Sequence, residues 1–254
     1  MKITGEEIVY DGKFISVKKI AFETKRGTSG VWETVKRKTF GKVVSIFALT
    51  SDREVILEKT FRVPLGTYVI ELPAGLMDKK GETPKEVIKR ELLEETGYSF
   101  AGEAQLILEG PFNAGLVADE MMTFFAENVE KVSEPCPEDA EDIKVIKVPL
   151  HELVDFVMNP PDGCKVDIKI LGVLPILKRK LAERIWERVG SQIRASGREL
   201  VSRTVGRLSK SDNGRLSFDV IDKLEKQGRI TVEDALQWKQ DIQNDIDLSE
   251  LDFY

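Results

Sequence analysis

Apolar and polar positions alternate through the first forty residues, and turn-forming residues interrupt the alternation twice. The turns are Tyr10–Lys13 and Lys25–Thr28, and each precedes a strand-like segment, Phe14–Val17 and Val31–Val35 respectively. Gly next to a polar residue between alternating segments is typical of a hairpin connection. The pattern therefore predicts a small antiparallel sheet at the start of the chain.

A continuous apolar run from Val43 to Leu49 indicates a buried strand. A turn at Ser51–Arg53 separates it from a second strand at Val55–Leu57, and Tyr68–Leu72 predicts a third. Three further strands are expected over residues 103–108, 121–127 and 143–148.

Helix signals are clearest directly after residue 82. Thr83 is a good N-cap, Pro84 suits the first helical position, and Glu86 completes the pattern T-x-x-E. Gly97 is placed to end the same helix.

Two more helices are expected before residue 181. One begins near Leu150, and the other covers Lys165–Lys180 with an interruption or bend at Pro175. Strands and helices around one mixed core predict the α/β class, as an α/β sandwich.

The charge changes sign along the last third of the chain. Residues 178–210 carry ten basic and three acidic side chains, a net charge of +7, whereas residues 211–254 carry five basic and eleven acidic ones, a net charge of −6. Apolar residues recur at helical spacing in the basic segment, and further helices are expected from Phe218 and Thr231. The basic helix either grips RNA phosphates or packs on the acidic tail or a second subunit, and we prefer the second interpretation.

These changes divide the chain into three expected parts. They are an N-terminal β segment at 1–40, a central domain at 41–178, and a helical C-terminal extension of unknown role at 179–254.

Composition narrows the class of protein. The chain has 254 residues, of which 41% are hydrophobic and 32% are charged, which is typical of a globular protein. A net charge of −6 argues against general nucleic-acid binding, and no apolar run approaches the ~20 residues of a membrane span. Cys136 and Cys164 form neither a zinc pattern nor a disulfide framework. We therefore expect a cytoplasmic protein that binds no membrane.

Three carboxylates crowd one face of the helix after Thr83. At ~100° per residue, Glu91, Glu94 and Glu95 fall within an arc of roughly 100°, and Arg90 alone cannot neutralise them. Ligation by several oxygens suits a hard divalent cation such as Mg²⁺ or Mn²⁺. An acidic solvated helix face is the alternative interpretation.

The wider pattern resembles the Nudix box, G-x5-E-x7-R-E-U-x-E-E-x-G-U, in which U is apolar. Glu82, seven intervening residues and Arg90–Tyr98 match every fixed position after the first. Gly75 and Glu82 are separated by six residues instead of five, so one residue is inserted around Lys79–Lys80. We expect the insertion to lengthen the loop and to leave the helical carboxylates in place.

Over residues 8–178 the chain resembles the ADP-ribose or nucleoside-diphosphate-sugar pyrophosphatase branch of the Nudix hydrolases. The stretches that carry this resemblance are Trp32–Arg37, Phe61–Pro64, Glu71–Leu76, Asp139–Ile143 and Val166–Lys169, together with the box. The resemblance implies an α/β/α sandwich for the central domain. It also implies Mg²⁺- or Mn²⁺-dependent cleavage of a nucleotide sugar to a nucleoside monophosphate and a sugar phosphate.

The resemblance also implies a metal shell. Glu91 and Glu95 would be the principal ligands, joined by the backbone carbonyl of Ala74 and by Glu94. Glu94 and Arg90 count among the catalytic residues, and Arg90 would orient the carboxylates without touching substrate.

Substrate contacts are implied at six positions. Arg37 and Arg62 would bind phosphates, since planar guanidinium groups suit that task, although each could instead form a surface ion pair. Phe14 and Trp32 match positions that stack a nucleobase, and core or interface packing is the alternative. Glu33 would accept a hydrogen bond from the base, and Leu116 would line the same site. Members of this branch are typically homodimers that exchange N-terminal segments, for which residues 1–40 are suited.

The general base is expected on the loop Pro135–Asp142. Glu141 is the first choice and Asp139 the second, with solvated loop charges as the alternative. Asp119 and Glu120 are further candidates for a metal or water contact. The single histidine, His151, lies outside every motif, so carboxylates are left to carry the acid–base chemistry.

Two other functions remain open at this point. The basic tail could bring RNA 5′ ends or a dinucleotide cofactor to the same site, or the domain could sense a nucleotide without hydrolysing it. The complete carboxylate set argues against a sensor, which has no need of a full metal-ligand array.

Overall fold

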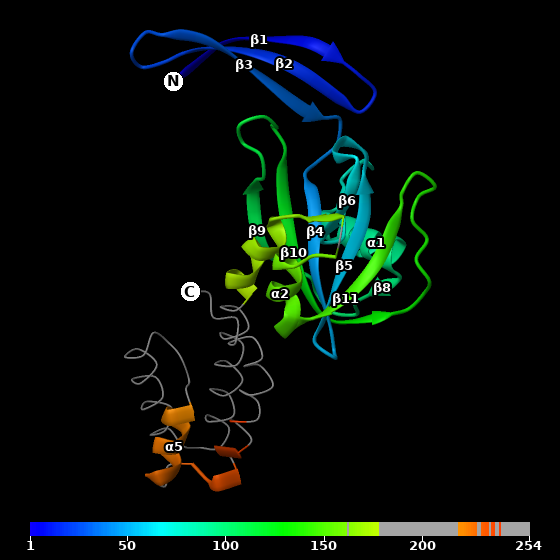
Figure 1. Cartoon of the computed structure of the whole chain (residues 1–254). Helices are drawn as coiled ribbons and strands as arrows, with labels where there is room; N and C mark the ends of the chain where they lie inside the picture. Colours follow the sequence, from blue (N-terminus) through cyan, green and yellow to red (C-terminus); the bar gives the residue numbers. More distant parts are fainter. Residues whose placement is uncertain (162, 178–217, 228–229, 234, 237–238, 240–254) are drawn as a thin grey trace. The chain divides into compact units, whose positions relative to one another are not determined.

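The computed structural model describes residues 1–161, 163–177, 218–227, 230–233, 235–236 and 239 (Figure 1). The chain divides into two compact units, one of residues 1–149 and 155–170 and the other of residues 150–154 and 171–254. The first unit contains every strand that the structure describes and the carboxylate helix, so the candidate site lies within it.

The N-terminal segment forms a three-stranded antiparallel sheet in the order β1-β2-β3, which confirms the predicted sheet (Figure 1). Its strands are β1 (Lys2–Asp11), β2 (Ile15–Glu23) and β3 (Ser29–Arg37). Large apolar side chains on this segment are exposed to solvent, namely Ile3, Ile8, Val9, Tyr10, Phe14, Val31 and Trp32.

A larger, nine-stranded mixed sheet follows. Its main path is β12-β6-β5-β4-β10-β8, while β11 pairs with β5, β7 with β4, and β9 with β10. The pairs β4–β10 and β6–β12 are parallel and the others are antiparallel. The strands are β4 (Val43–Thr50), β5 (Glu54–Arg62), β6 (Thr67–Glu71), β7 (Ala74–Leu76), β8 (Tyr98–Ser99), β9 (Gln105–Pro111), β10 (Glu120–Lys131), β11 (Ile143–Pro149) and β12 (Cys164–Val166).

Strand β5 changes partner halfway along its length. Val55 and Ile56 pair with β4, whereas Glu58 to Arg62 pair with β6, and β11 runs along the opposite edge. Beyond this point β4 pairs with the short strand β7, in which Ala74 lies opposite Ser45. The partner change therefore opens the sheet at the level of Glu58 and brings β7 beside β4.

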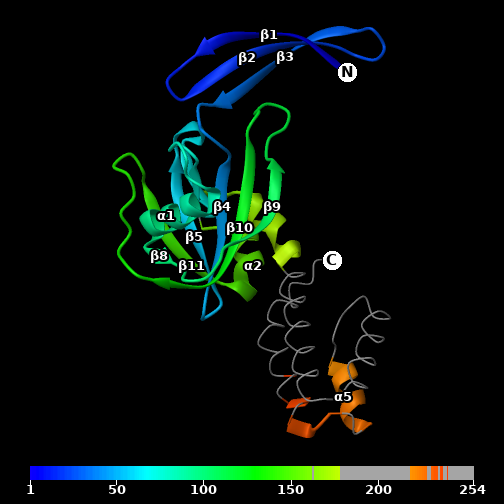
Figure 2. The same ribbon diagram turned by 180° about the vertical axis from the view of Figure 1, so that it is seen from behind.

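Helix α1 (Pro84–Thr96) lies across one face of this sheet (Figure 2). Thr83 and Glu86 form the predicted capping box, and Gly97 ends the helix with a left-handed φ of 76°. Val87, Ile88 and Leu92 on α1 pack with buried side chains of β4, β5 and β10, which are Val44, Ile46, Ala48, Ile56, Phe124 and Ala126. The predicted helix is confirmed at both ends, and its apolar face fixes the direction of its carboxylates.

The predicted helix over Lys165–Lys180 is wrong at its N-terminal end. Cys164–Val166 forms β12, which pairs with β6, and the helix begins at residue 169. Asp167 explains the start, because its carboxylate accepts a hydrogen bond from the backbone N–H of Lys169 at 3.0 Å. The helix continues through Pro175 to residue 177, and residues 178–180 lie outside the described residues.

The strands β7 and β8 are absent from the prediction as well, because two or three residues are too few to show alternation. The other predicted strands of the large sheet are confirmed, and helices are few within the described α/β fold. A short 3₁₀ turn, Val63–Leu65, connects β5 to β6.

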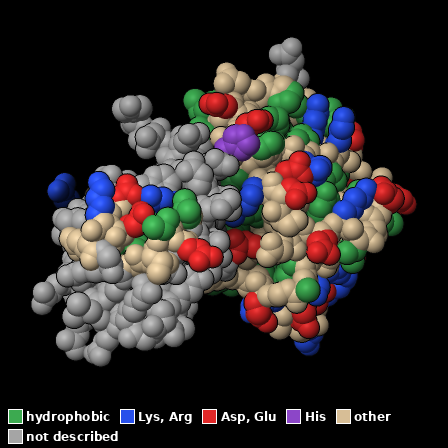
Figure 3. Space-filling view, turned by 90° about the horizontal axis from the view of Figure 1, so that it is seen from below, with side chains coloured by type: hydrophobic (Ala, Val, Ile, Leu, Met, Phe, Trp, Pro, Cys, Tyr) green, Lys and Arg blue, Asp and Glu red, His purple; other side chains and the backbone are tan. Residues whose placement is uncertain are grey.

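The second unit begins at Leu150 with a 3₁₀ turn (Leu150–Glu152). This turn leads into α2 (Leu153–Met158), as expected, and residues 155–158 of α2 belong to the first unit. Its single histidine, purple in Figure 3, lies at the surface with half of its side chain exposed. The predicted helix from Phe218 is α5 (Phe218–Lys226), and the helix after Thr231 begins at residue 232.

The basic segment 178–210 lies outside the described residues. The domain boundary at residue 178 therefore stays a prediction. Among the helices that are described, none combines the length and the apolar character that a membrane crossing requires.

Candidate active site

Helix α1 and strand β7 together build the acidic centre. Glu91 faces Gly75 so closely that a β-carbon at position 75 would stand 2.2 Å from Oε1 of Glu91. Any larger residue would displace the Glu91 carboxylate or the strand. Gly75 therefore acts by leaving space for an acidic side chain, which is a packing reason for a glycine in the box.

Arg90 is held among four carboxylates. Its Nη1 lies 3.0 Å from both Glu91 and Glu94, its Nε lies 3.3 Å from Glu82, and its Nη2 lies 3.8 Å from Asp78. Desolvation of the partly buried guanidinium lowers the pKa of Arg90, but Glu82, Glu91 and Glu94 outweigh it and raise that pKa above its usual value. The ion pairs with Arg90 fix the orientation of the Glu91 and Glu94 side chains.

Glu95 is the deepest carboxylate of the helix, with 6% of its surface exposed. Its Oε2 accepts a hydrogen bond from the backbone N–H of Ala74 at 3.2 Å, so the Ala74 peptide lies at the carboxylate. Burial, followed by the neighbouring Glu58 charge, raises the pKa of Glu95 strongly. Burial also raises the pKa of Glu91 to about 7, although Arg90 opposes that rise. In both residues desolvation of the carboxylate is the largest cause of the raised pKa.

Sequence reasoning missed Glu58. This residue lies on β5, is 2% exposed, and has its carboxyl group beside that of Glu95. Burial raises the pKa of Glu58 well above its ordinary value. In the sequence, Glu58 is visible only as an acidic residue at the end of the run Val55-Ile56-Leu57-Glu58. An ordinary interruption of a strand gives the same pattern.

The donor set suits a hard divalent cation. Glu91, Glu94, Glu95 and the Ala74 carbonyl carry oxygen atoms of the kind that such a cation binds, and Oε1 of Glu58 is a buried oxygen without a hydrogen-bond partner among the described residues. In the described part of the chain, no group of three acidic, thiol or imidazole side chains is arranged so that it could hold a metal ion. In the described arrangement Arg90 holds Glu91 and Glu94, so these side chains are turned toward the guanidinium group.

The two predicted phosphate-binding arginines are each anchored by a carboxylate. Arg62 donates from Nε to Glu71 at 2.7 Å, and Arg37 donates from Nη1 to Asp119 at 2.8 Å. The Arg37 guanidinium also lies 5.7 Å from the ring centre of Phe112. Asp119 therefore positions Arg37. Glu120, the other acidic candidate of that segment, forms an ion pair with Lys42 at 2.5 Å.

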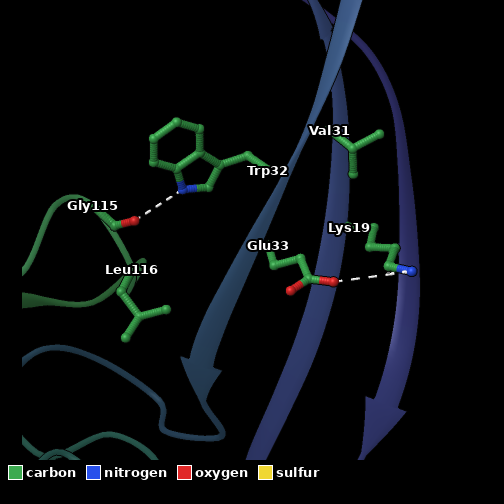
Figure 4. Close-up of a pocket in the computed structure, with 6 residues that line it drawn as sticks. All are labelled: Lys19, Val31, Trp32, Glu33, Gly115 and Leu116. Atoms are coloured by element: carbon green, nitrogen blue, oxygen red, sulfur yellow. Dashed lines mark hydrogen bonds and ion pairs between the residues drawn. The ribbon is translucent and has the colours of Figure 1, made fainter.

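An open hollow of about 690 Å³ lies between the N-terminal sheet and the loop before β10. Its walls are formed by Lys19, Val31, Trp32, Glu33, Gly115 and Leu116 (Figure 4). The indole Nε1 of Trp32 donates to the Gly115 carbonyl at 2.9 Å, and Lys19 lies 4.0 Å from Glu33. Three of the predicted substrate residues, Trp32, Glu33 and Leu116, are thus brought together.

Phe14 is not part of this lining. Its ring is 71% exposed, and the Lys13 ammonium group lies 4.8 Å from its centre. The structure of one chain therefore places Phe14 on the surface of the N-terminal segment.

Both candidate bases lie on the exposed loop between β10 and β11. The carboxylate of Glu141 accepts from the backbone N–H of Glu138 at 3.0 Å, and its charge contributes to the raised pKa of Glu91 and Glu95. Asp139 is exposed on the same loop. Glu141 is therefore electrostatically coupled to the acidic centre.

Comparison with known proteins agrees with this arrangement. The model of the NUDIX domain matches residues 39–170. A putative nudix hydrolase 2 of Caenorhabditis elegans is 39% identical over 105 residues, which are 38% of this chain and 47% of that protein, so the match spans about half of its length. An ADP-sugar pyrophosphatase of Mus musculus is 33% identical over 164 residues, which are 60% of this chain and 75% of that protein.

A solved structure described as an ADP compounds hydrolase aligns with a TM-score of 0.60 at 21% identity. The alignment covers 72% of this chain and 95% of that one, which shows a shared fold. The domain model spans more than half of the chain and contains α1, β7 and the acidic centre. This chain belongs to the NUDIX domain family.

Proposed function

We propose that the protein hydrolyses the diphosphate bond of ADP-ribose or a related nucleotide sugar, with Mg²⁺ or Mn²⁺ as cofactor. The products would be a nucleoside monophosphate and a sugar phosphate. The observation that carries this proposal is the acidic centre, in which α1 places Glu91 against Gly75 and Glu95 at the Ala74 peptide of β7. The relative named as an ADP-sugar pyrophosphatase supports the substrate class.

Each residue has a separate task in this reaction. Glu91, Glu94, Glu95 and the Ala74 carbonyl would hold the cation, and Arg90 would keep the carboxylates in place. A bound divalent cation neutralises diphosphate oxygens and lowers the pKa of water. Glu141, or Asp139 in its place, would take the proton from the water whose oxygen attacks phosphorus, while the bridging P–O bond breaks.

The remaining contacts would position the substrate. Arg62 donates Nε to Glu71, and its side chain is 47% exposed, so its terminal amino groups can meet a phosphate. Arg37 would contribute in the same way. The hollow beside Trp32 suits a flat nucleobase, with Glu33 as hydrogen-bond acceptor and Leu116 as an apolar contact.

A homodimer formed through the N-terminal segment would complete the site. The exposed apolar side chains of β1 and β3 form a surface that one chain leaves in solvent, and Phe14 lies on the same segment. A partner chain would cover this surface and bring the Phe14 ring to a nucleobase. The free thiols Cys136 and Cys164 support a reducing compartment, so we place the protein in the cytoplasm.

The experiment is product analysis by chromatography. Purified protein with Mg²⁺ is incubated with ADP-ribose and a panel of nucleotide sugars, and the expected products from ADP-ribose are AMP and ribose phosphate. Tight ADP-ribose binding without AMP release would contradict the hydrolase proposal and favour a sensing module. Turnover restricted to capped RNA or a dinucleotide cofactor would contradict the substrate class.

A further inference from the structure

The face of β5 that points toward α1 is polar where the strand changes partner. Side chains alternate along a strand, so Glu58 and Thr60 lie on the same face as Ile56, which packs with the apolar residues of α1. Glu58 is 2% exposed and Thr60 is 5% exposed. A carboxylate and a hydroxyl group are therefore buried side by side at the edge of an apolar core.

Two atoms of this pair are unsatisfied. Oε1 of Glu58 and Oγ1 of Thr60 are buried and have no hydrogen-bond partner among the described residues. Buried polar atoms in folded proteins are nearly always paired, and an unpaired carboxylate oxygen is especially unfavourable. Such atoms indicate that a further group belongs at this place.

The neighbouring charges indicate which group it is. The Glu58 carboxyl group contacts that of Glu95, and Glu71 lies opposite Glu58 in the strand register. The nearby cation is Arg62, whose Nε is committed to Glu71 at 2.7 Å. Two carboxyl groups in contact require either a proton or a cation between them. An oxygen-rich environment of this kind suits a divalent cation.

We propose that Glu58 is a further ligand of the divalent cation bound by Glu95, reaching it from β5 beneath the helix. This inference rests on the proposed function, because Glu95 belongs to the proposed metal shell. Glu58 lies outside the box and outside α1, and the partner change in β5 places it there. The cation would then be gripped from both the helix and the sheet.

The test is calorimetric titration of the full chain with Mn²⁺, without substrate. We compare wild type with Glu58→Gln, which keeps the shape, and Glu58→Val, which suits an apolar strand position. Glu54→Gln is the matched control, since Glu54 lies on the same strand and pairs with Lys147 at the surface. Glu95→Gln reports on the proposed metal shell itself.

Both Glu58 variants should weaken Mn²⁺ binding tenfold or more, while Glu54→Gln stays within twofold of wild type. Thermal unfolding supplies a second readout. Without metal, Glu58→Val should melt at or above the wild-type temperature, because a buried carboxyl group is replaced by an apolar one. Its rise in melting temperature on adding Mn²⁺ should be smaller than that of wild type.

Two results would separate failure of this inference from failure of the proposed function. Wild-type Mn²⁺ affinity in both Glu58 variants, with binding lost in Glu95→Gln, would overturn the role of Glu58 and leave the proposed metal shell intact. Mn²⁺ binding that is unchanged in Glu95→Gln as well would overturn both.

Discussion

Gly75 and Glu91 are in such close contact that the space of a single methyl group at position 75 is occupied by the Glu91 carboxylate. Gly75→Ala should therefore push Glu91 away from β7. We expect Mn²⁺ affinity and kcat each to fall by roughly tenfold or more, because a metal ligand would lose its position. Calorimetry and initial rates measure the two effects.

Gly110→Ala is the matched control for this substitution. Gly110 lies on β9, and a β-carbon there would meet no atom within 4 Å. Both variants should have similar circular dichroism spectra, and Gly110→Ala should retain wild-type kinetics. Equal activity in the two variants would show that the space beside Glu91 has no role.

Trp32 should determine substrate affinity more than turnover. Trp32→Ala removes the ring that borders the hollow, and stacking on a base is worth ~1–3 kcal/mol, so kcat/KM should fall roughly 5- to 150-fold. The change should appear mainly in KM, because a base contact is made equally in ground and transition states. Steady-state kinetics with ADP-ribose measures it.

Trp32→Phe separates stacking from loop positioning. Phenylalanine keeps a flat ring but cannot donate to the Gly115 carbonyl. If stacking dominates, Trp32→Phe should recover most of the affinity that Trp32→Ala loses. A Trp32→Ala variant with unchanged KM would exclude the hollow as the base site.

The stabilisation of the fold by Thr83 should depend on pH. Hydrogen bonds from the backbone N–H and hydroxyl of Thr83 lower the pKa of Glu86 below its ordinary value of 4.5. This contribution is present above pH 4.5, and it is lost as the pH falls through the lowered pKa that Glu86 has in the folded state. Thr83→Ala should cost about 1 kcal/mol at pH 7 and somewhat less at pH 3, because only the hydrogen bond from the hydroxyl to Glu86 depends on the Glu86 charge, whereas the bond from the Glu86 backbone N–H to Oγ1 of Thr83 does not.

Urea unfolding at the two pH values measures this difference. Thr83→Ser keeps the hydroxyl group and should remain close to wild type. A Thr83→Ala penalty that is the same at both pH values would contradict the capping-box account.

The exposed apolar side chains of β1 should be covered by a second chain. Light scattering after size exclusion should give twice the chain mass of 28.6 kDa. Ile8→Asp places a charge on that surface, since Ile8 is 56% exposed, and should shift the protein toward monomer. Glu7→Asp on the same strand is the control. A wild-type monomer at micromolar concentration would refute the dimer.

Local signals made α1 predictable from sequence. Thr83, Pro84, Glu86 and Gly97 each act on their own neighbours, so the helix and the arc of its carboxylates follow without knowledge of the rest of the chain. The long buried strand β4 was equally clear from its continuous apolar run.

Contacts between distant segments could not be predicted from such local signals. The burial of Glu58 depends on β5 leaving β4 for β6, and the anchoring of Arg37 depends on Asp119, 82 residues away. Strand β12 is three residues long and exists because β6 offers it an edge. These features arise from contacts between segments that are distant in the sequence, and the pattern within one segment does not reveal such contacts.

The most direct test of the account is the metal requirement of ADP-ribose hydrolysis. Protein treated with chelator should release no AMP, added Mg²⁺ or Mn²⁺ should restore release, and Glu95→Gln should lower kcat by roughly 100-fold or more at saturating metal while remaining folded. AMP release that persists without divalent cation, or wild-type turnover in Glu95→Gln, would contradict it.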